Sequence, residues 1–289
     1  MPRPAFNTLA QGRIAVIAEH TEDLPIVAEV PSEHFGRTSS DSWNLLVYLE
    51  RNLNRTNIYG TAYGRHMARV NKMVLLSLCA AFERFLKELA AVCVDHLALR
   101  VLDNRLDELS QRGSTFAAHF EAHALGRAMC ESVTWLDCDE VNIRFRKILS
   151  LDDPNDRFYV FPEKGNQQPA AEQWRYRTMS NLWQLRHTIA HNDGVITRSD
   201  ALKLRLLIKA PVESPKVIRP TKDDIRSVKR FLEETADSIN SRVADRLASC
   251  LEQLYDADNS LFVPATEAAA LAPKFKRPVT IAGQTANPP

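Results

Sequence analysis

The stretch from Arg65 to about Leu102 constrains the fold most, because it contains neither proline nor glycine over its whole length. Apolar side chains recur along it at steps of three and four residues, the spacing of one helix face. They are Val70, Val74, Leu75, Leu78, Phe82, Phe85, Leu86, Leu89 and Val92. An unbroken helix here would be roughly 55 Å long. We therefore expect it to form the backbone of a helical bundle.

A second long amphipathic helix is predicted after Thr221 and Asp224, which have the spacing of a capping box. The apolar positions that follow are Ile225, Val228, Phe231, Leu232, Ile239, Val243, Leu247, Leu251 and Leu254. Further helices are predicted over 41–57, 115–131 and 141–151, and after Pro169. The predicted fold class is all-α, an antiparallel helical bundle with long helices.

Two kinds of segment depart from the helical pattern. The run from Ala201 to Ala210 and the Val217-Ile218 pair predict a small β-hairpin insertion, with a helix over 199–209 as the alternative. Proline-rich stretches bound the chain's regular part. The predicted organisation is an irregular N-terminal arm over 1–40, a helical domain over 41–256, and a flexible Pro- and Ala-rich tail over 257–289.

Composition narrows the class of protein. The formal net charge of +1 among 289 residues excludes a general DNA-coating protein, so any nucleic-acid site must be a local patch. Five scattered cysteines without a CxxC pair indicate neither a disulfide framework nor a zinc knuckle. No apolar run is long enough to span a bilayer, and no signal core is present near Met1. We expect a soluble, cytoplasmic protein that makes no membrane contact.

The helix that follows Pro169 carries the residues best suited to chemistry. Its apolar stripe consists of Met179, Leu182, Trp183, Ile189 and Ala190. Arg186 falls within this stripe, and a guanidinium so placed must find a carboxylate, a phosphate or carbonyl oxygens. Gly194 predicts the helix end, which puts His191 in or near the last turn. A regular helix would rotate His191 roughly 140° from Arg186. Only a frayed helix end or a second copy of the helix would bring them to one substrate.

Arg186, His187 and His191, followed by Asn192-Asp193-Gly194, resemble the signature of the HEPN superfamily and in particular its RiboL-PSP and MAE-like group. That signature is an arginine, an adjacent polar residue and a histidine four to six positions after the arginine. The resemblance implies a helical bundle that dimerises across this helix. In active members it implies a metal-independent endoribonuclease that leaves 2′,3′-cyclic phosphates, and it suggests a role as a toxin or phage-defence effector with an antitoxin or regulatory partner protein.

Metal-free RNA cleavage needs a base, an acid and positive charge at the phosphorane. We expect His191 to act as base or acid, Arg186 to hold the phosphate, and His187 to orient the site or relay a second proton. Asn192 and Asp193 are supporting residues by their place in the motif. No cofactor and no metal is expected, and RNA and a second copy of the chain are the expected partners.

Several residues outside the motif are weaker candidates. Glu83 is the acidic residue we would pair with Arg186, although it also suits a solvated position. The candidates for RNA contact are Arg175 and Arg177, on the motif helix, and Arg144, Arg146 and Lys147, over 141–151. For Arg175 and Arg177 the competing interpretation is that the neighbouring aromatics lie in the core and the arginine heads reach solvent. For Arg144, Arg146 and Lys147 it is a solvated helix face.

Two alternatives to the nuclease remain open from the sequence. The chain would be a HEPN-like module that dimerises or binds RNA without cleaving it, if Arg186 is closed off by protein acceptors. It would be a metal hydrolase if His187, His191 and Asp193 held an ion, but the sequence identifies no further ligand. A second pair, His119 and His123, also has chelate spacing, and most such pairs are partly exposed imidazoles.

Overall fold

The computed structural model describes residues 28–29, 31–55, 60–97, 126, 129–130, 134–151, 156, 158–161, 170–208, 210–257 and 279–280. Its helices are α2 (Pro31–Arg55), α3 (Gly60–Leu97), α6 (Cys138–Ile148), α7 (Ala170–Asn192), α8 (Arg198–Ile208) and α9 (Lys222–Ala257). Its strands are β1 (Ala28–Glu29), β2 (Val195–Ile196), β3 (Lys216–Val217) and β4 (Val279–Thr280). The predicted all-α class with a small hairpin is confirmed.

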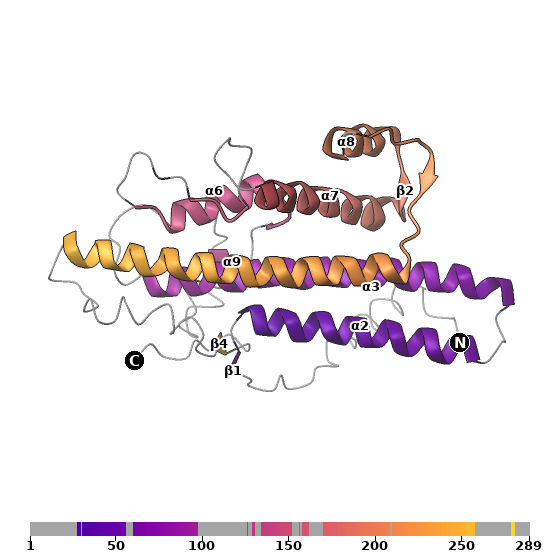
Figure 1. Cartoon of the computed structure of the whole chain (residues 1–289), viewed down its shortest axis with the longest axis horizontal. Helices are drawn as coiled ribbons and strands as arrows, with labels where there is room; N and C mark the ends of the chain where they lie inside the picture. Colours follow the sequence, from indigo (N-terminus) through magenta and orange to yellow (C-terminus); the bar gives the residue numbers. More distant parts are fainter. Residues whose placement is uncertain are drawn as a thin grey trace, which may run out of the picture.

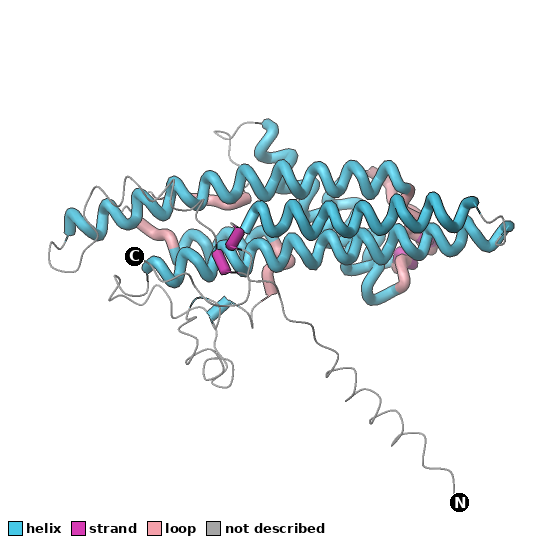
Figure 2. Tube along the Cα trace, turned by 90° about the horizontal axis from the view of Figure 1, so that it is seen from below, coloured by secondary structure: helices cyan, strands magenta, loops and turns pink. Residues whose placement is uncertain are grey.

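Three long helices form the body of the molecule. Helices α2, α3 and α9 contact one another pairwise, and α6 and α7 pack along another side of α3 (Figure 1). Figure 2 shows the same long helices from a perpendicular direction. Helix α8 packs on α7 and β2, beyond the main bundle. The end of α7 is therefore held between α3 on one side and α8 on the other.

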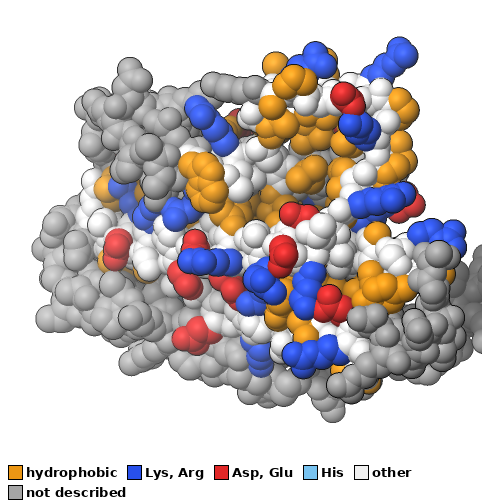
Figure 3. All heavy atoms as spheres, turned by 45° about the vertical axis from the view of Figure 1, so that its right-hand side comes forward, with side chains coloured by type: hydrophobic (Ala, Val, Ile, Leu, Met, Phe, Trp, Pro, Cys, Tyr) orange, Lys and Arg blue, Asp and Glu red, His pale blue; other side chains and the backbone are white. Residues whose placement is uncertain are grey.

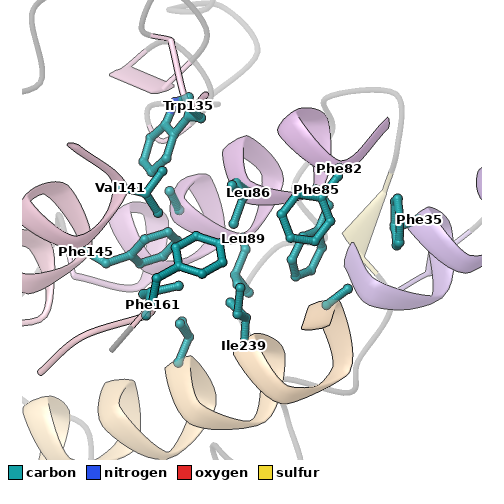
Figure 4. Close-up of a cluster of buried hydrophobic side chains, with 14 of the residues drawn as sticks. Phe35, Phe82, Phe85, Leu86, Leu89, Trp135, Val141, Phe145, Phe161 and Ile239 are labelled. Atoms are coloured by element: carbon teal, nitrogen blue, oxygen red, sulfur yellow. The ribbon is translucent and has the colours of Figure 1, made fainter. Parts of the chain in front are cut away.

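The apolar stripe predicted for α3 is the centre of the core. Val74, Leu75, Leu78, Phe82, Phe85, Leu86 and Leu89 are each at most 5% exposed. Phe82 packs edge to face on Phe35 of α2, with ring centroids 5.5 Å apart. Side chains from α6 and α9 complete the cluster (Figure 4). Burial of each such side chain contributes about 1.5–3 kcal/mol, so this helix supplies much of the fold's stability.

Helix α2 begins ten residues earlier than the sequence pattern indicated, at Pro31 rather than near Asp41. Proline is well suited to a first helical turn, because its missing N–H would have no partner there. The hydroxyls of Thr38 and Ser39 donate to His34 O and Gly36 O, so a run that resembles a helix start lies inside the helix. The predicted irregular arm over 1–40 is therefore wrong for residues 31–40.

The segment after β2 is a helix, which was the alternative prediction for 199–209. Alternating leucines suggested a strand, but α8 buries Ala201 and Leu204 and exposes Leu202 and Leu206. The predicted strand at Val217 does form: Val217 pairs with Val195 in the antiparallel β2–β3 ladder. The hairpin is thus made by residues on either side of α8, and α8 is inserted in its connection.

The predicted start of the last helix is confirmed. Thr221 N donates to Asp224 Oδ2 at 2.8 Å, and Asp224 N donates back to Thr221 Oγ1 at 3.2 Å. From the predicted tail, the structure describes β4, which pairs with β1 in the register Ala28 with Thr280. The rest of residues 258–289, and the predicted His119 and His123 pair, lie outside the described residues.

Two global properties follow from the described elements. Within the part of the chain that the structure describes, no helix is both long and apolar enough to cross a bilayer. All five cysteines are buried free thiols.

Candidate functional site

The candidate site lies where α7 ends. The helix is regular through Asn192, and the chain then reverses through Asp193 and Gly194, with φ values of +47° and +82°. Gly194 N donates to Thr188 O at 3.1 Å, and Gly194 O accepts from Ile218 N at 2.8 Å. The turn therefore ties the end of α7 to the chain that leaves β3, and it fixes the last helical turn.

His187 and His191 form an exposed pair of imidazoles one helical turn apart. Their ring centroids are 4.6 Å apart and the rings are inclined by 46°. Both side chains are exposed, and neither makes a hydrogen bond to any residue within the described ranges. Two imidazoles are thus available to solvent at one place at the end of α7.

Arg186 faces the bundle rather than the histidine pair. It is partly buried beside Cys79 of α3: burial raises the pKa of the Cys79 thiol to about 12, and the charge of Arg186 lowers it. Across the residues that the structure places, Arg186 has no hydrogen bond and no ion pair. Arg186 is therefore available to bind an anion supplied from outside the chain.

Glu83 does not pair with Arg186, contrary to our expectation. Its carboxylate accepts from Lys87 Nζ at 3.3 Å and from the backbone N–H of Trp135 at 3.3 Å. Lys87 is one turn away on the same helix, and the Trp135 amide has no helical partner of its own. These two nearer donors occupy Glu83, and they leave the charge of Arg186 uncompensated on this side.

The geometry of α7 decides how the motif can work. Because the helix does not fray before Asn192, a rotation of about 100° per residue places His191 roughly 140° from Arg186 around the helix axis. His191 points to solvent, and Arg186 points toward α3. A frayed helix end, one of the two ways to unite them, is therefore not what the structure contains.

Asp200 is a site residue that the sequence analysis missed. It lies in the first turn of α8, is 4% exposed, and accepts from Gln184 Nε2 at 3.1 Å and Asn192 Nδ2 at 3.0 Å. It also accepts from Thr197 N at 3.1 Å and Thr197 Oγ1 at 2.8 Å. Burial raises the pKa of Asp200. The hydrogen bonds from Thr197 and Asn192 and the charge of His187 lower it by more, so the net shift of the pKa is downward.

The predicted supporting residue Asn192 is thus part of the connection between α7 and α8. Its amide is committed to Asp200, so it holds the helix end and is not presented to solvent as a free donor. A signal for Asp200 did exist in the sequence. Thr197 and Asp200 have the same Thr-x-x-Asp spacing that correctly located the start of α9 at Thr221 and Asp224.

Lys72 of α3 is the second residue that the sequence did not reveal. Its ammonium donates to Asp193 O and lies 3.5 Å from Asp193 Oδ1. Its side chain is 12% exposed, so most of its length lies against protein. A cation at a helix C-terminus is favoured by the helix dipole. No local pattern around residue 72 could have predicted this contact, because its partner is 121 residues away.

Asp193 is therefore not a good third ligand for a metal. Its carboxylate is exposed and paired with Lys72, and its backbone is turned away from the helix by its positive φ. No group of three or more His, Cys, Asp or Glu side chains suited to a metal occurs among the described residues. The His187 and His191 pair alone offers two ligands, fewer than the three protein ligands typical of a catalytic zinc site.

The predicted basic patch on α6 is largely used within the fold. The guanidinium of Arg144 lies 5.3 Å from the Trp135 ring centroid and bonds to Glu140 at 3.2 Å and to Thr134 O. Arg146 lies over the Tyr159 ring, at 6.0 Å. Lys147, partly buried, lies one residue further along α6. The cluster is held close to the protein surface and is not a free phosphate-binding row.

The arginines upstream on α7 also lie far from the histidine pair. Arg175 donates to Ser238 Oγ of α9 at 3.0 Å. Arg177, partly buried, makes no ion pair with a described residue. Helix α6 meets α7 near Tyr176, through Cys138 Sγ. Fifteen residues separate Tyr176 from His191, so roughly 22 Å of helix lies between the two groups.

Together these features define an all-α bundle with an exposed imidazole pair, supported by α8 and by α3, at the end of one helix. No protein-family model matches this sequence, and no curated protein or solved structure is significantly similar to it.

Proposed function

We propose that this protein is a metal-independent endoribonuclease of HEPN type. The observation that carries the proposal is the pair of exposed imidazoles, His187 and His191, whose ring centroids are 4.6 Å apart. Arg186, next to them in sequence, has no hydrogen-bond acceptor among the described residues. A purely structural arginine would be expected to have a carboxylate or carbonyl partner. The resemblance of Arg186, His187 and His191 to the HEPN signature supplies the reaction class.

In this mechanism the two histidines divide the proton transfers. One imidazole removes the proton of the 2′-hydroxyl, and the other protonates the leaving 5′-oxygen. Arg186 binds the scissile phosphate and stabilises the charge that develops on the phosphorane. The products carry 2′,3′-cyclic phosphate and 5′-hydroxyl ends, and the reaction uses neither metal nor cofactor.

The active unit in this proposal is a homodimer. One α7 helix presents Arg186 and His191 in directions roughly 140° apart, so one chain is poorly arranged to apply both to one phosphate. A second copy of α7 packed across the first would supply the missing group to each of two equivalent sites. The RNA therefore binds between two chains.

The test is cleavage of total tRNA and of a generic RNA in EDTA, read on a denaturing gel. We expect cleavage by wild type and by His66→Ala, which removes an exposed histidine of α3, and none by Arg186→Ala or His191→Ala. Circular dichroism should be the same for all four proteins. Cleavage by His191→Ala at the wild-type rate would refute the assignment. If wild type cleaved RNA without EDTA but not with it, the protein would be a metal enzyme.

A second candidate function is a non-catalytic dimerisation or RNA-binding module, and one observation favours it. Leu202, Leu206, Val195 and Val217 are 39–71% exposed on α8 and the hairpin. Figure 3 shows hydrophobic side chains gathered at this end of the molecule, with Lys and Arg around them. RNA retained in a band-shift experiment but left intact, with equal affinity for wild type and His191→Ala, would select this function.

The biological role proposed with the nuclease is that of a toxin or phage-defence effector held in check by a partner protein. Expression of wild type in a bacterial host should then arrest growth, and expression of His191→Ala should not. Equal growth in the two cultures, with purified wild type active on RNA, would favour a role in RNA processing instead.

A further inference from the structure

Two helix starts among the described residues have the same design, and they differ in one respect. Thr197 and Asp200 open α8, and Thr221 and Asp224 open α9. In both, the aspartate accepts from the N–H and the hydroxyl of the threonine, at distances of 2.8–3.1 Å. Such a cap needs no further partner to stabilise its own helix.

Asp200 has partners that a helix cap does not require. Its Oδ1 accepts from Gln184 and its Oδ2 from Asn192, both on α7. Asp224, in contrast, is exposed, and among the described residues it bonds only within its own cap. Gln184 and Asn192 are eight residues apart, and His187 and His191 lie between them. At 3.6 residues per turn, positions 184, 187, 188, 191 and 192 share one side of the helix. The buried carboxylate therefore spans the two turns that carry the histidine pair.

The charge on this carboxylate also acts on the pair. The positive charge of protonated His187 is one of the influences that lower the pKa of Asp200, so the two groups are close enough to interact. Other ionisable or charged groups near this helix end include His191, in ring contact with His187, Arg186 on the same helix, and the Lys72 and Asp193 pair from α3 and the turn. Among the described residues, Asp200 is the one fully buried carboxylate, and the charge of His187 acts on it.

We propose that Asp200 is the positioning residue of the histidine pair: its carboxylate fixes the last two turns of α7 and supports the positive charge that His187 carries during proton transfer. It does not touch substrate, since it is 4% exposed and four donors occupy its oxygens. The role deepens the proposed nuclease function and rests on it, but the arrangement of the two rings can be measured without any RNA.

The first experiment compares Asp200→Asn with Asp224→Asn, which weakens the equivalent cap of α9 and has no link to α7. In RNA cleavage we expect Asp200→Asn to lower kcat about 10- to 100-fold with KM unchanged, because small displacements of reacting groups have effects of this size. Asp224→Asn should retain kcat within about twofold. A third variant, Asn192→Ala, leaves the Thr197 cap in place and removes one of the two links to α7, so it should show an intermediate loss.

The second experiment is the nuclear Overhauser effect between the rings of His187 and His191, which needs no catalysis. We expect a strong effect in wild type and in Asp224→Asn, and a weak one in Asp200→Asn. An unchanged effect and an unchanged kcat in Asp200→Asn would overturn the proposal, as would an equal loss in Asp224→Asn. If wild type does not cleave RNA, the function fails but the ring measurement still decides whether Asp200 positions the pair.

Discussion

Buried acidic groups show how single residues connect this fold to pH. Asp200 and Asp95 are both withdrawn from solvent, but their environments move the pKa in opposite directions. Asp200 has four hydrogen bonds and its pKa is lowered, whereas Asp95 accepts from Gly126 N at 2.6 Å and its pKa is raised by burial to about 6. The number of hydrogen-bond donors around a carboxylate, and not its burial alone, decides whether its pKa is lowered or raised.

Asp95→Asn should stabilise the protein above pH 6. A raised carboxyl pKa means that the folded state binds the proton more tightly than the unfolded state, so ionised Asp95 lowers stability at neutral pH. Removing the charge should raise the free energy of unfolding at pH 7.5 by up to about 3 kcal/mol. The gain should disappear as pH falls from 6 to 4, where Asp95 is protonated in the folded protein. Urea unfolding of wild type and Asp95→Asn at pH 7.5 and at pH 4 measures this difference. Equal stability of the two proteins at pH 7.5 would contradict the prediction.

The opposite sign applies to Asp200. Its pKa is depressed in the folded state, so its contribution to stability is present above the pKa of the unfolded chain and is lost as pH falls through the folded value. Asp200→Asn should therefore be less stable than wild type at pH 7, by about 1–2 kcal/mol, with a gap that narrows on acidification. A gap that widened below pH 4 in urea unfolding would count against this account.

Gly194 is the residue whose replacement should damage the turn most directly. Its φ of +82° disfavours any side chain, and a Cβ atom would lie 2.9 Å from Lys72 Nζ. Gly194→Ala should cost about 1–2 kcal/mol in the free energy of unfolding, since the αL penalty adds to the displacement of Lys72. Gly64→Ala is the matched control, because nothing lies near its Cβ position. Equal stability of the two variants would show that the turn adapts.

At the scale of elements, α8 shows where sequence reasoning succeeds and where it fails. The stripe of α3 and the cap of α9 could be predicted, because their signals are local and repeat over many residues. The leucines of α8 alternate in sequence and suggested a strand. The burial of Ala201 and Leu204, three residues apart, while Leu202 and Leu206 are exposed, is the pattern of a helix. The contacts of Lys72 with Asp193 and of Glu83 with Trp135 join segments 121 and 52 residues apart, so no local pattern could have predicted them. The Thr-x-x-Asp spacing at Thr197 could have located the cap formed by Asp200, but not its hydrogen bonds to α7.

The two faces of α8 should respond differently to mutation. Leu204 is 4% exposed, so Leu204→Ala should lower the free energy of unfolding by about 2–4 kcal/mol. Leu206 is 71% exposed, so Leu206→Ala should change it by less than about 0.5 kcal/mol. Chemical denaturation of both variants checks the assignment of α8 as a helix. A strand would place both side chains on one face and give similar losses.

At the scale of the whole molecule, the bundle sets the direction of every group in the motif. Helix α7 lies against α3 and carries α8 near its end, and the side chains of His187 and His191 remain exposed there. Arg186 is turned toward α3 instead. Because Arg186 and His191 of one chain point in different directions, the proposed reaction is best served by a site that two chains form together.

A mixture of two inactive variants should test the two-chain site. If each site takes Arg186 from one chain and His191 from the other, Arg186→Ala and His191→Ala will form heterodimers with one intact site. After dissociation and random reassociation of equal amounts, we expect about one quarter of the wild-type cleavage rate. Light scattering should give the mass of a dimer for all three samples. A mixture as inactive as either variant alone would mean that each site is built by a single chain.

All five cysteines are buried, so the rate at which a thiol reagent modifies them depends on how often the helices separate. Thiolates, not thiols, react with disulfide reagents, and burial raises the pKa of the thiols of Cys79 and Cys130 to about 12. Modification in native conditions must therefore wait until the helices separate. Cys79 lies on α3 close enough to Arg186 of α7 for the two groups to interact. The labelling rate of its thiol would therefore report how often α3 and α7 separate at the proposed site.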